Sequence, residues 1–261
     1  MNILETIIAR KREEVAVAKA ECSIAALEAK PLFKRTCLSL KSFLLDKSKV
    51  GIIAEYKRRS PSKGIINATA GVVEVTTAYA QFGASGISVL TDTDFFGGSL
   101  EDLLVARVNE VPLLRKDFMI DEYQLVEAKA YGADVILLIA ACLSPVEVAR
   151  LAAFAKQLGL EVLLELHDES EIEHICDSVD LVGVNNRNLK TFTVDLEQSV
   201  KLAAKIDNRF IKVAESGISD TEALRYLKGH GFQGFLIGEN FMKQSSPAES
   251  FRSFVEELNR G

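Results

Sequence analysis

One pattern recurs along most of this chain: a short apolar run, a few polar or glycine residues, and then an amphipathic stretch of about ten residues. Such runs are typical of buried parallel strands, and the stretches between them have helical spacing. The apolar runs are residues 52–54, 87–90, 111–114, 135–139, 162–166, 181–184, 211–214 and 235–237. The helical stretches that follow them are residues 72–82, 100–108, 122–131, 145–158, 169–176, 195–205, 220–227 and 247–259.

This alternation predicts an α/β protein, because each strand has its own helix. Eight strand–helix units in about 210 residues match a closed (β/α)8 barrel, the TIM barrel. An open doubly wound sheet would be expected to have fewer units and a G-x-G-x-x-G turn after its first strand, and that turn is missing. No linker marks a boundary, so we expect a single domain over residues 1–261, with residues 1–48 as an N-terminal helical extension and residues 51–261 as the barrel.

The extension itself is predicted to be helical. Residues 2–30 place apolar side chains at helical spacing among charged ones, Pro31 ends this helix, and a second short helix is expected near residues 38–45. From the residues alone, a packing cap is favoured over a catalytic role.

Composition narrows the function classes. The net charge of −6 argues against general nucleic-acid binding, and no apolar run approaches the roughly 18 residues that span a membrane. The N-terminus mixes charges of both signs, unlike a signal peptide. The four cysteines lack C-x-x-C spacing and are interpreted as reduced thiols, so we expect a cytoplasmic protein.

The stretch GIIAEYKRRSPSKG, residues 51–64, joins an apolar run to several ionisable groups and a polar loop. Glu55 and Lys57 would share one face of a strand by its period of two. Read in isolation, such a stretch is more often a surface salt bridge and a solvated basic loop than a functional site.

In a (β/α)8 barrel the C-terminal ends of the strands meet at one mouth, where catalysis takes place. Polar groups recur at these ends, which suggests a shared polar cavity. They are Glu55, Lys57, Thr91, Asp92, Arg115, Lys116, Asp117, Glu165, Asn185, Arg187, Glu215 and Ser216. Structural salt bridges remain an equal alternative for Asp92, Asp117, Arg115 and Arg187 taken one by one.

Lys116 and Glu165 are the most specific candidates for catalysis, because two groups of opposite proton affinity that face one pocket can act as acid and base. His167 lies just beyond Glu165, and we interpret it as the start of a loop that caps the next helix. The 3 histidines are scattered and no Cys/His cluster has metal-ligand spacing, so we predict no metal site.

The last two units carry a different signal. Glu215-Ser216-Gly217 ends one strand, and Gly238-Glu239 follows the last strand just before another helical turn. Glycines here would let backbone N–H groups face an anion, and the loops after strands seven and eight of this fold commonly bind phosphate.

These residues fall within stretches that resemble the indole-3-glycerol phosphate synthase family over essentially the whole chain. The matching stretches are IIAEYKRRSPSKG, SVLTDTDFFGGS, LLRKDF, LLELH, GVNNRNL, VAESGI and FLIGENFM. The resemblance implies that 1-(2-carboxyphenylamino)-1-deoxyribulose 5-phosphate is closed into an indole ring with loss of carbon dioxide and water. It implies no organic cofactor or metal.

The resemblance also implies roles for individual residues. Lys116 resembles the general acid that protonates the substrate carbonyl, Glu165 its partner in proton transfer, and Lys57 a second lysine on the carboxylate side. Which lysine serves which step stays open. By the same resemblance, Glu55 would orient both lysines. Asn185 would hold polar substrate atoms, and Glu215 would assist around the hydroxylated chain of the substrate. Ser60 would contact the carboxylate side.

The implied phosphate-binding positions are Ser216, Gly217, Gly238 and Glu239. Glu239 departs from the serine that many members have, and we expect only its backbone N–H to face phosphate, because its side chain would repel the anion. In the resemblance the N-terminal helix helps to close the substrate pocket, and the loop around Lys63 is expected to move over the site.

Two rival readings remain. The preceding pathway isomerase, a sibling barrel, would be expected to use a cysteine near the end of its first strand, where this chain has Glu55 and Lys57. A barrel that had lost catalysis would lack Lys116 or Glu165, and both are present. The expected partner is a small phosphorylated substrate, with no nucleic acid or membrane; transient contact with other tryptophan-pathway enzymes is left open.

Overall fold

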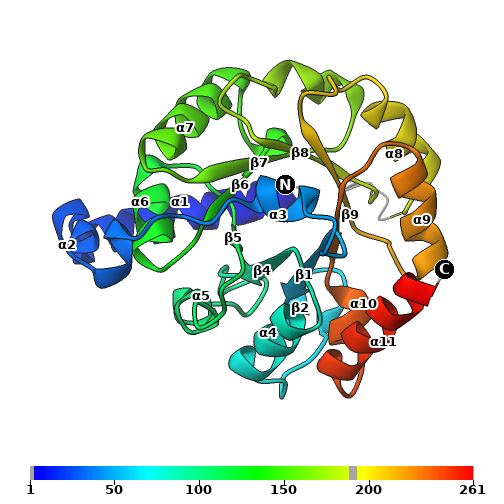
Figure 1. Cartoon of the computed structure of the whole chain (residues 1–261). Helices are drawn as coiled ribbons and strands as arrows, with labels where there is room; N and C mark the ends of the chain where they lie inside the picture. Colours follow the sequence, from blue (N-terminus) through cyan, green and yellow to red (C-terminus); the bar gives the residue numbers. More distant parts are fainter. Residues whose placement is uncertain (1–2, 188–192, 261) are drawn as a thin grey trace.

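The computed structural model describes residues 3–187 and 193–260, and its centre is a closed barrel of eight parallel strands (Figure 1). The strands follow the order β1-β10-β9-β8-β7-β6-β5-β4 around the barrel. The predicted (β/α)8 barrel is therefore confirmed. The strands are β1 Ile52–Tyr56, β4 Gly86–Leu90, β5 Leu113–Lys116, β6 Val135–Ile139, β7 Glu161–Leu166, β8 Leu181–Asn185, β9 Ile211–Glu215 and β10 Gly234–Ile237.

Helices surround the strands (Figure 1). They are α4 Val72–Gln81, α5 Leu100–Ala106, α6 Glu122–Ala130, α7 Pro145–Gln157, α8 Leu196–Ala203, α9 Thr221–Gly229 and α11 Pro247–Arg260. The segment expected to be a helix over residues 169–176 is instead a short 3-10 helix, η3 Glu169–His174. Strand β5 begins later than residue 111 because Pro112 has no N–H to donate to a ladder.

Short elements that the periodicity did not predict lie at the strand ends. They are the two-stranded hairpin of β2 Arg59–Ser60 and β3 Gly64–Ile65 and the 3-10 turn η2 Ala140–Cys142. The helix α10 Glu239–Met242 is the helical turn that was expected after the last strand. All of them follow the C-terminal ends of barrel strands, where loops are free to vary without disturbing the core.

Side chains alternate between two buried layers along each strand. In β1, Ile52, Ala54 and Tyr56 pack against the outer helices, whereas Ile53 joins the cluster that fills the barrel interior. Leu114, Leu163 and Val213 occupy the same interior cluster. In these four strands the next inward position, two residues on, is polar: Glu55, Lys116, Glu165 and Glu215. The period of two thus places a polar layer on top of an apolar plug.

The N-terminal extension is not the single helix predicted for residues 2–30. It forms α1 Ile3–Glu21 and α2 Ile24–Glu28, which are separated at Ser23. The Ser23 hydroxyl accepts a hydrogen bond from the N–H of Ala26 at 3.2 Å and so begins a new helix. Pro31 does not simply end the helix but starts the 3-10 helix η1 Pro31–Lys34.

The two ends of the extension contact opposite ends of the barrel. Leu40 and Leu44 of α3 Leu40–Leu45 join the interior cluster beside Gly86 and Gly234, which begin β4 and β10. Helix α3 therefore plugs the N-terminal end of the barrel.

Helix α1 lies at the C-terminal end of the strands. Its Lys11 is buried and reaches Asp92, two residues after β4, and Asp117, which directly follows β5. Arg10 pairs with Asp94 at 2.7 Å, and the Tyr123 hydroxyl donates to the carbonyl of Ala18 at 2.9 Å. The extension is thus tied to the rim of the barrel mouth.

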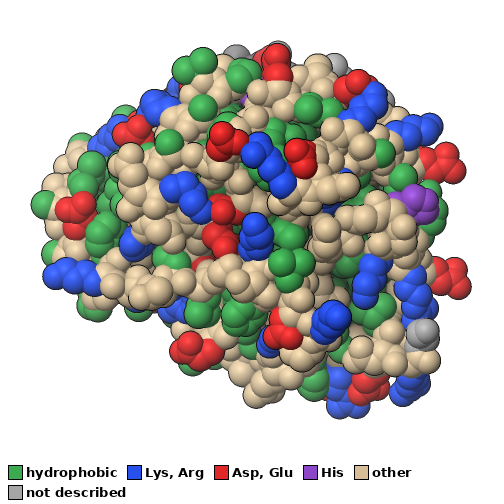
Figure 2. Space-filling model, turned by 45° about the horizontal axis from the view of Figure 1, so that its top comes forward, with side chains coloured by type: hydrophobic (Ala, Val, Ile, Leu, Met, Phe, Trp, Pro, Cys, Tyr) green, Lys and Arg blue, Asp and Glu red, His purple; other side chains and the backbone are tan. Residues whose placement is uncertain are grey.

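Within the described residues, no helix is long and apolar enough to cross a membrane. The cysteines at positions 22, 37, 142 and 176 are free thiols. Basic and acidic side chains are interspersed over the face shown in Figure 2.

Candidate active site

An ammonium group flanked by two carboxylates lies in the barrel mouth. Lys116 Nζ of β5 is 2.7 Å from Glu215 Oε2 of β9 and 3.1 Å from Glu165 Oε2 of β7. The Glu165 and Glu215 side chains are only 6% and 1% exposed, and Lys116 is 16% exposed. The lysine is therefore the most exposed member of this triad.

The environment shifts the proton affinities of the triad in different directions. Burial alone would lower the pKa of Lys116, but the charges of Glu165, Glu215 and Glu55 outweigh it and raise the pKa. Burial alone would raise the pKa of Glu165, but Lys116, His167 and Asn185 hold it well below its usual value. Burial raises the pKa of Glu215 to about 7, against the opposing effect of Lys116. Two carboxylates that share one ammonium group but differ in their pKa values are suited to acid–base catalysis.

Glu165 has further partners besides the lysine. Asn185 Nδ2 donates to Glu165 Oε1 at 2.9 Å, and His167 Nε2 lies 3.0 Å from the same oxygen. The interpretation of His167 as the cap of the following helix is wrong, because Asp168 caps that helix and the His167 side chain turns inward. Its position two residues after Glu165 carried the signal, since the inward face of β7 continues to it.

Glu55 and Lys57 meet as the period of two predicted. Lys57 Nζ lies 2.7 Å from Glu55 Oε1, and the two side chains are 16% and 5% exposed. This is a buried pair at the mouth, which removes the alternative of a surface salt bridge. Glu55 contacts Lys57 directly and acts on Lys116 through its charge.

Two glycines make room for the site carboxylates. A Cβ on Gly238 would lie 2.5 Å from Glu55 Oε1, and a Cβ on Gly183 would overlap Glu215 Oε1. The sequence suggested that Gly238 frees a backbone N–H for an anion; the structure adds that the missing side chain leaves space for Glu55.

Replacing Gly183 with alanine is expected to displace the Glu215 carboxylate from Lys116, because the added methyl group needs the same space. Overpacking of this kind typically costs about 1–3 kcal/mol. We expect kcat to fall by roughly tenfold or more, since small misplacements in a site are costly. The measurements are steady-state kinetics and thermal unfolding. Gly229→Ala is the control, because no atom lies near its would-be Cβ; equal kcat in both variants would refute this role.

The implied phosphate positions lie together beyond β9 and β10. Ser216 and Gly217 have left-handed φ values of 66° and 72°, and the Ser216 carbonyl accepts from Asn186 Nδ2 at 2.7 Å. The Glu239 carboxylate lies 3.4 Å from Arg187 Nη2 and 3.6 Å from Lys63 Nζ. These two cations partly offset the charge that would repel an anion here.

Other polar groups at the strand ends are structural. Arg115 Nη2 contacts Asp117 at 3.1 Å, and its Nη1 contacts Glu127 of α6 at 2.8 Å. Asp92 accepts from the N–H of Phe95 at 2.8 Å and pairs with Lys11. For these residues the salt-bridge alternative holds.

Ser60 is buried in the β2–β3 hairpin that follows β1, and its hydroxyl lies 3.5 Å from that of Ser62. Ser60 follows Lys57 by three residues in the segment after β1.

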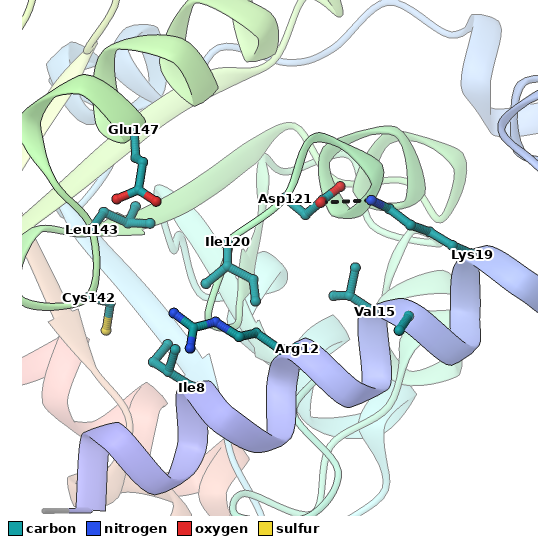
Figure 3. A pocket seen from close by; sticks show the side chains of 10 residues that line it. Ile8, Arg12, Val15, Lys19, Ile120, Asp121, Cys142, Leu143 and Glu147 are labelled. Carbon is teal, nitrogen blue, oxygen red and sulfur yellow. Dashed lines mark hydrogen bonds and ion pairs between the residues drawn. The ribbon is translucent and has the colours of Figure 1, made fainter.

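A cavity of about 330 Å³ lies beside the triad, between α1 and the loops after β5 and β6 (Figure 3). Figure 3 shows the Arg12 guanidinium directed into it, with Cys142 on the barrel side and the Lys19–Asp121 ion pair at its edge. Lys116, Glu165 and Glu215 do not line this cavity. It therefore adjoins the acid–base site rather than containing it.

Among residues 3–187 and 193–260, no group of three or more His, Cys, Asp or Glu side chains could hold a metal ion.

Known proteins resemble this chain over nearly its whole length. A family model described as indole-3-glycerol phosphate synthase matches residues 4–254. The indole-3-glycerol phosphate synthase of Bacteroides thetaiotaomicron is 48% identical over 258 residues, which cover 98% of this chain and 99% of the relative. The enzyme of the same name from Koribacter versatilis is 40% identical, with 97% and 99% covered.

Solved structures support the fold alone. A chain of the tryptophan synthase complex from Pyrococcus furiosus has a TM-score of 0.60 at 16% identity and covers 82% of this chain and 99% of its own length. KGPDC from Streptococcus mutans has a TM-score of 0.58 at 15% identity, with 80% and 97% covered.

Proposed function

Because the chain belongs to the indole-3-glycerol phosphate synthase family, we propose that Lys116 is the general acid of its reaction and that Glu165 exchanges protons with it. The reaction closes 1-(2-carboxyphenylamino)-1-deoxyribulose 5-phosphate into indole-3-glycerol phosphate, with loss of carbon dioxide and water, in tryptophan biosynthesis. The chain is accordingly a carboxy-lyase, EC 4.1.1.48. The observation that carries the residue assignment is the Lys116 ammonium between Glu165 and Glu215.

Ring closure requires an acid. As the electron-rich ring carbon attacks the carbonyl, Lys116 donates a proton to the carbonyl oxygen, which becomes a hydroxyl group. The flanking carboxylates keep Lys116 charged before this step, so that a proton is available. The carboxylate then leaves the ring carbon as carbon dioxide, and the bonding electrons restore the aromatic ring.

Dehydration requires an acid again and a base. The hydroxyl group departs as water when it receives a proton, and Glu165 takes up the proton released from the ring system. Asn185, which donates to Glu165, is placed to contact polar substrate atoms in the same space. Glu215, whose pKa is raised, can hold a proton and contact the hydroxylated chain.

Lys57 is proposed to hold the substrate carboxylate until it leaves, with Glu55 orienting its ammonium. Ser60 supplies a hydroxyl on the same side. In this proposal Lys116 protonates the carbonyl oxygen during ring closure, and Lys57 can protonate the hydroxyl group during dehydration. Both lysines can reach the substrate because they extend from the inward faces of strands at one mouth.

The phosphate is proposed to bind beyond β9 and β10, at backbone groups of Ser216, Gly217, Gly238 and Glu239. Arg187 supports this placement, because it brings a cation to a carboxylate that would otherwise repel phosphate. We further propose that the chain is a single domain, acts in the cytoplasm, and makes transient contact with other tryptophan-pathway enzymes. The free thiols support a reducing compartment.

The assignment of Glu165 is tested with Glu165→Gln, which keeps the shape and removes the charge. We expect kcat to fall by about 10²–10⁴-fold, because loss of a positioned base has that cost. The measurement is the fluorescence of the indole product formed by the purified chain. Glu161→Gln, on the same strand at the opposite end of the barrel, is the control; a Glu165→Gln enzyme within threefold of the parent would exclude this role.

A further inference from the structure

We propose that His167 is a positioning residue of this site, a buried imidazolium that keeps Glu165 charged and oriented toward Lys116 and Asn185. The inference deepens the proposed function, because it rests on the role given to Glu165.

The backbone brings His167 to Glu165. Both residues are on the inward side of the chain at the end of β7, two positions apart. His167 Nε2 is 3.0 Å from Glu165 Oε1, and the imidazole is only 9% exposed. The contact is therefore shielded from solvent, where an ion pair is screened least.

A second carboxylate holds the imidazole from behind. His167 Nδ1 lies 3.5 Å from Glu171 Oε2, and the backbone N–H of His167 donates to the same oxygen at 2.6 Å. Glu171 belongs to η3, so the 3-10 helix fixes the ring from outside the barrel. Glu171, His167, Glu165, Lys116 and Glu215 then form a chain of charges that alternate in sign.

The contacts of His167 with Glu165 and Glu171 are ion pairs at close range. Neither ring nitrogen of His167 makes a hydrogen bond of ordinary geometry, although both lie at ion-pair distance from a carboxylate. Burial alone would lower the pKa of His167, but Glu165 and Glu171 outweigh it and raise the pKa to about 10. The imidazole is thus protonated at neutral pH and loses its charge only as the pH rises through about 10.

His167 explains why the two carboxylates on Lys116 differ. Glu165 faces Lys116, His167 and the amide of Asn185, and all three favour its charged form. Glu215 shares the same lysine, but its Oε1 has no hydrogen-bond partner within the described part of the chain and lies against Gly183. The remaining titratable groups near the pair are Glu55 of β1 and Cys142 in η2, whose thiol is kept uncharged because burial raises its pKa. Among residues 3–187 and 193–260, only the Glu165 side of Lys116 has a second cation, so the base is placed there.

The kinetic test compares His167→Asn with His174→Asn, using the parent enzyme as reference. His174 is a buried histidine of the same segment, but its ring contacts the backbone carbonyls of Leu143 and Glu171. Removing the cation at His167 raises the pKa of Glu165, so the acidic limb of the kcat/KM profile should move to higher pH by about one unit. We expect kcat at neutral pH to fall roughly tenfold with KM little changed. His174→Asn should lower the melting temperature and leave the limb in place.

An independent readout uses ¹⁵N NMR of the histidine rings in the parent protein. Only 3 histidines are present, and the His174→Asn and His167→Asn spectra assign them. The His167 ring should remain doubly protonated at pH 8, where an unperturbed histidine is neutral. A His167 ring that titrates near 6.5, or a His167→Asn profile that does not move, would overturn the proposal. An imidazolium at pH 8 together with an active Glu165→Gln enzyme would instead refute the role given to Glu165.

Discussion

Replacement of Lys116 with methionine is expected to lower kcat by about a thousandfold or more, because the proposed ring-closing step loses its proton donor. The methionine side chain has a similar length and lacks the charge. Without the ammonium, Glu165 and Glu215 face each other in a site that is nearly closed to solvent. Glu215 should then take up a proton, since its pKa is already raised. We therefore expect the protein to fold, with a moderate loss of stability.

The measurement is indole fluorescence during single-turnover and steady-state assays, together with circular dichroism to show folding. Lys116→Arg serves as the matched variant: it keeps the charge and should recover stability, but its planar guanidinium should not recover turnover. A Lys116→Met enzyme within tenfold of the parent kcat would remove Lys116 from the chemistry. The proposed acid would then have to be Lys57, the other lysine at the mouth.

Replacement of Lys11 with methionine is expected to destabilise the protein by about 3–5 kcal/mol, the typical cost of removing one partner from a buried ion pair. Lys11 lies 2.9 Å from Asp92 and 3.0 Å from Asp117, and the three side chains are at most 4% exposed. The substitution leaves two buried carboxylates without this cation. Asp117 directly follows Lys116, so we also expect kcat to fall.

This loss should depend on pH in a defined direction. Burial alone would raise the pKa of Asp117, but Arg115 and Lys11 outweigh it and lower the pKa to about 2. Stability from a lowered pKa is fully present above the unfolded value of about 3.9 and is lost as the pH falls through the folded value. The difference between parent and variant should therefore be full at pH 7 and shrink between about pH 4 and pH 2.

Urea unfolding at several pH values measures this effect. Arg10→Met on the same helix is the control, because its pair with Asp94 is exposed to solvent and such pairs contribute little to stability. Equal stability of the two variants would show that Lys11 does not anchor the extension.

Much of the fold could be predicted because its signal is local. Each strand is an apolar run bounded by polar residues, and each helix has its own amphipathic spacing, so eight repeats predicted the barrel. The break at Ser23 was missed because residues on both sides keep helical spacing and a serine cap competes locally with continuation of the helix. The helix predicted for residues 169–176 is longer than the 3-10 helix that the structure shows there, because periodicity alone does not distinguish a short 3-10 helix from an α-helix.

The residues of the site also include some that the sequence predicts and some that it does not. Glu55, Lys116, Glu165 and Glu215 could be placed at the mouth because strand ends and the period of two are visible in the chain. Lys11, His167 and Gly183 could not. A lysine on an amphipathic helix is normally solvated, a lone histidine after a strand is normally a loop residue, and a glycine within a strand suggests only a close approach.

The sequence by itself determined the alternation of elements, the barrel, and the strand ends at which polar groups would gather, because these follow from short-range periodicity and turn chemistry. Tertiary structure alone decided which charges meet. Lys116 has its partners at positions 165 and 215, Lys11 at positions 92 and 117, and Glu215 has its space at position 183. Pairing and pKa depend on distances between residues far apart in the chain, and barrel closure sets those distances.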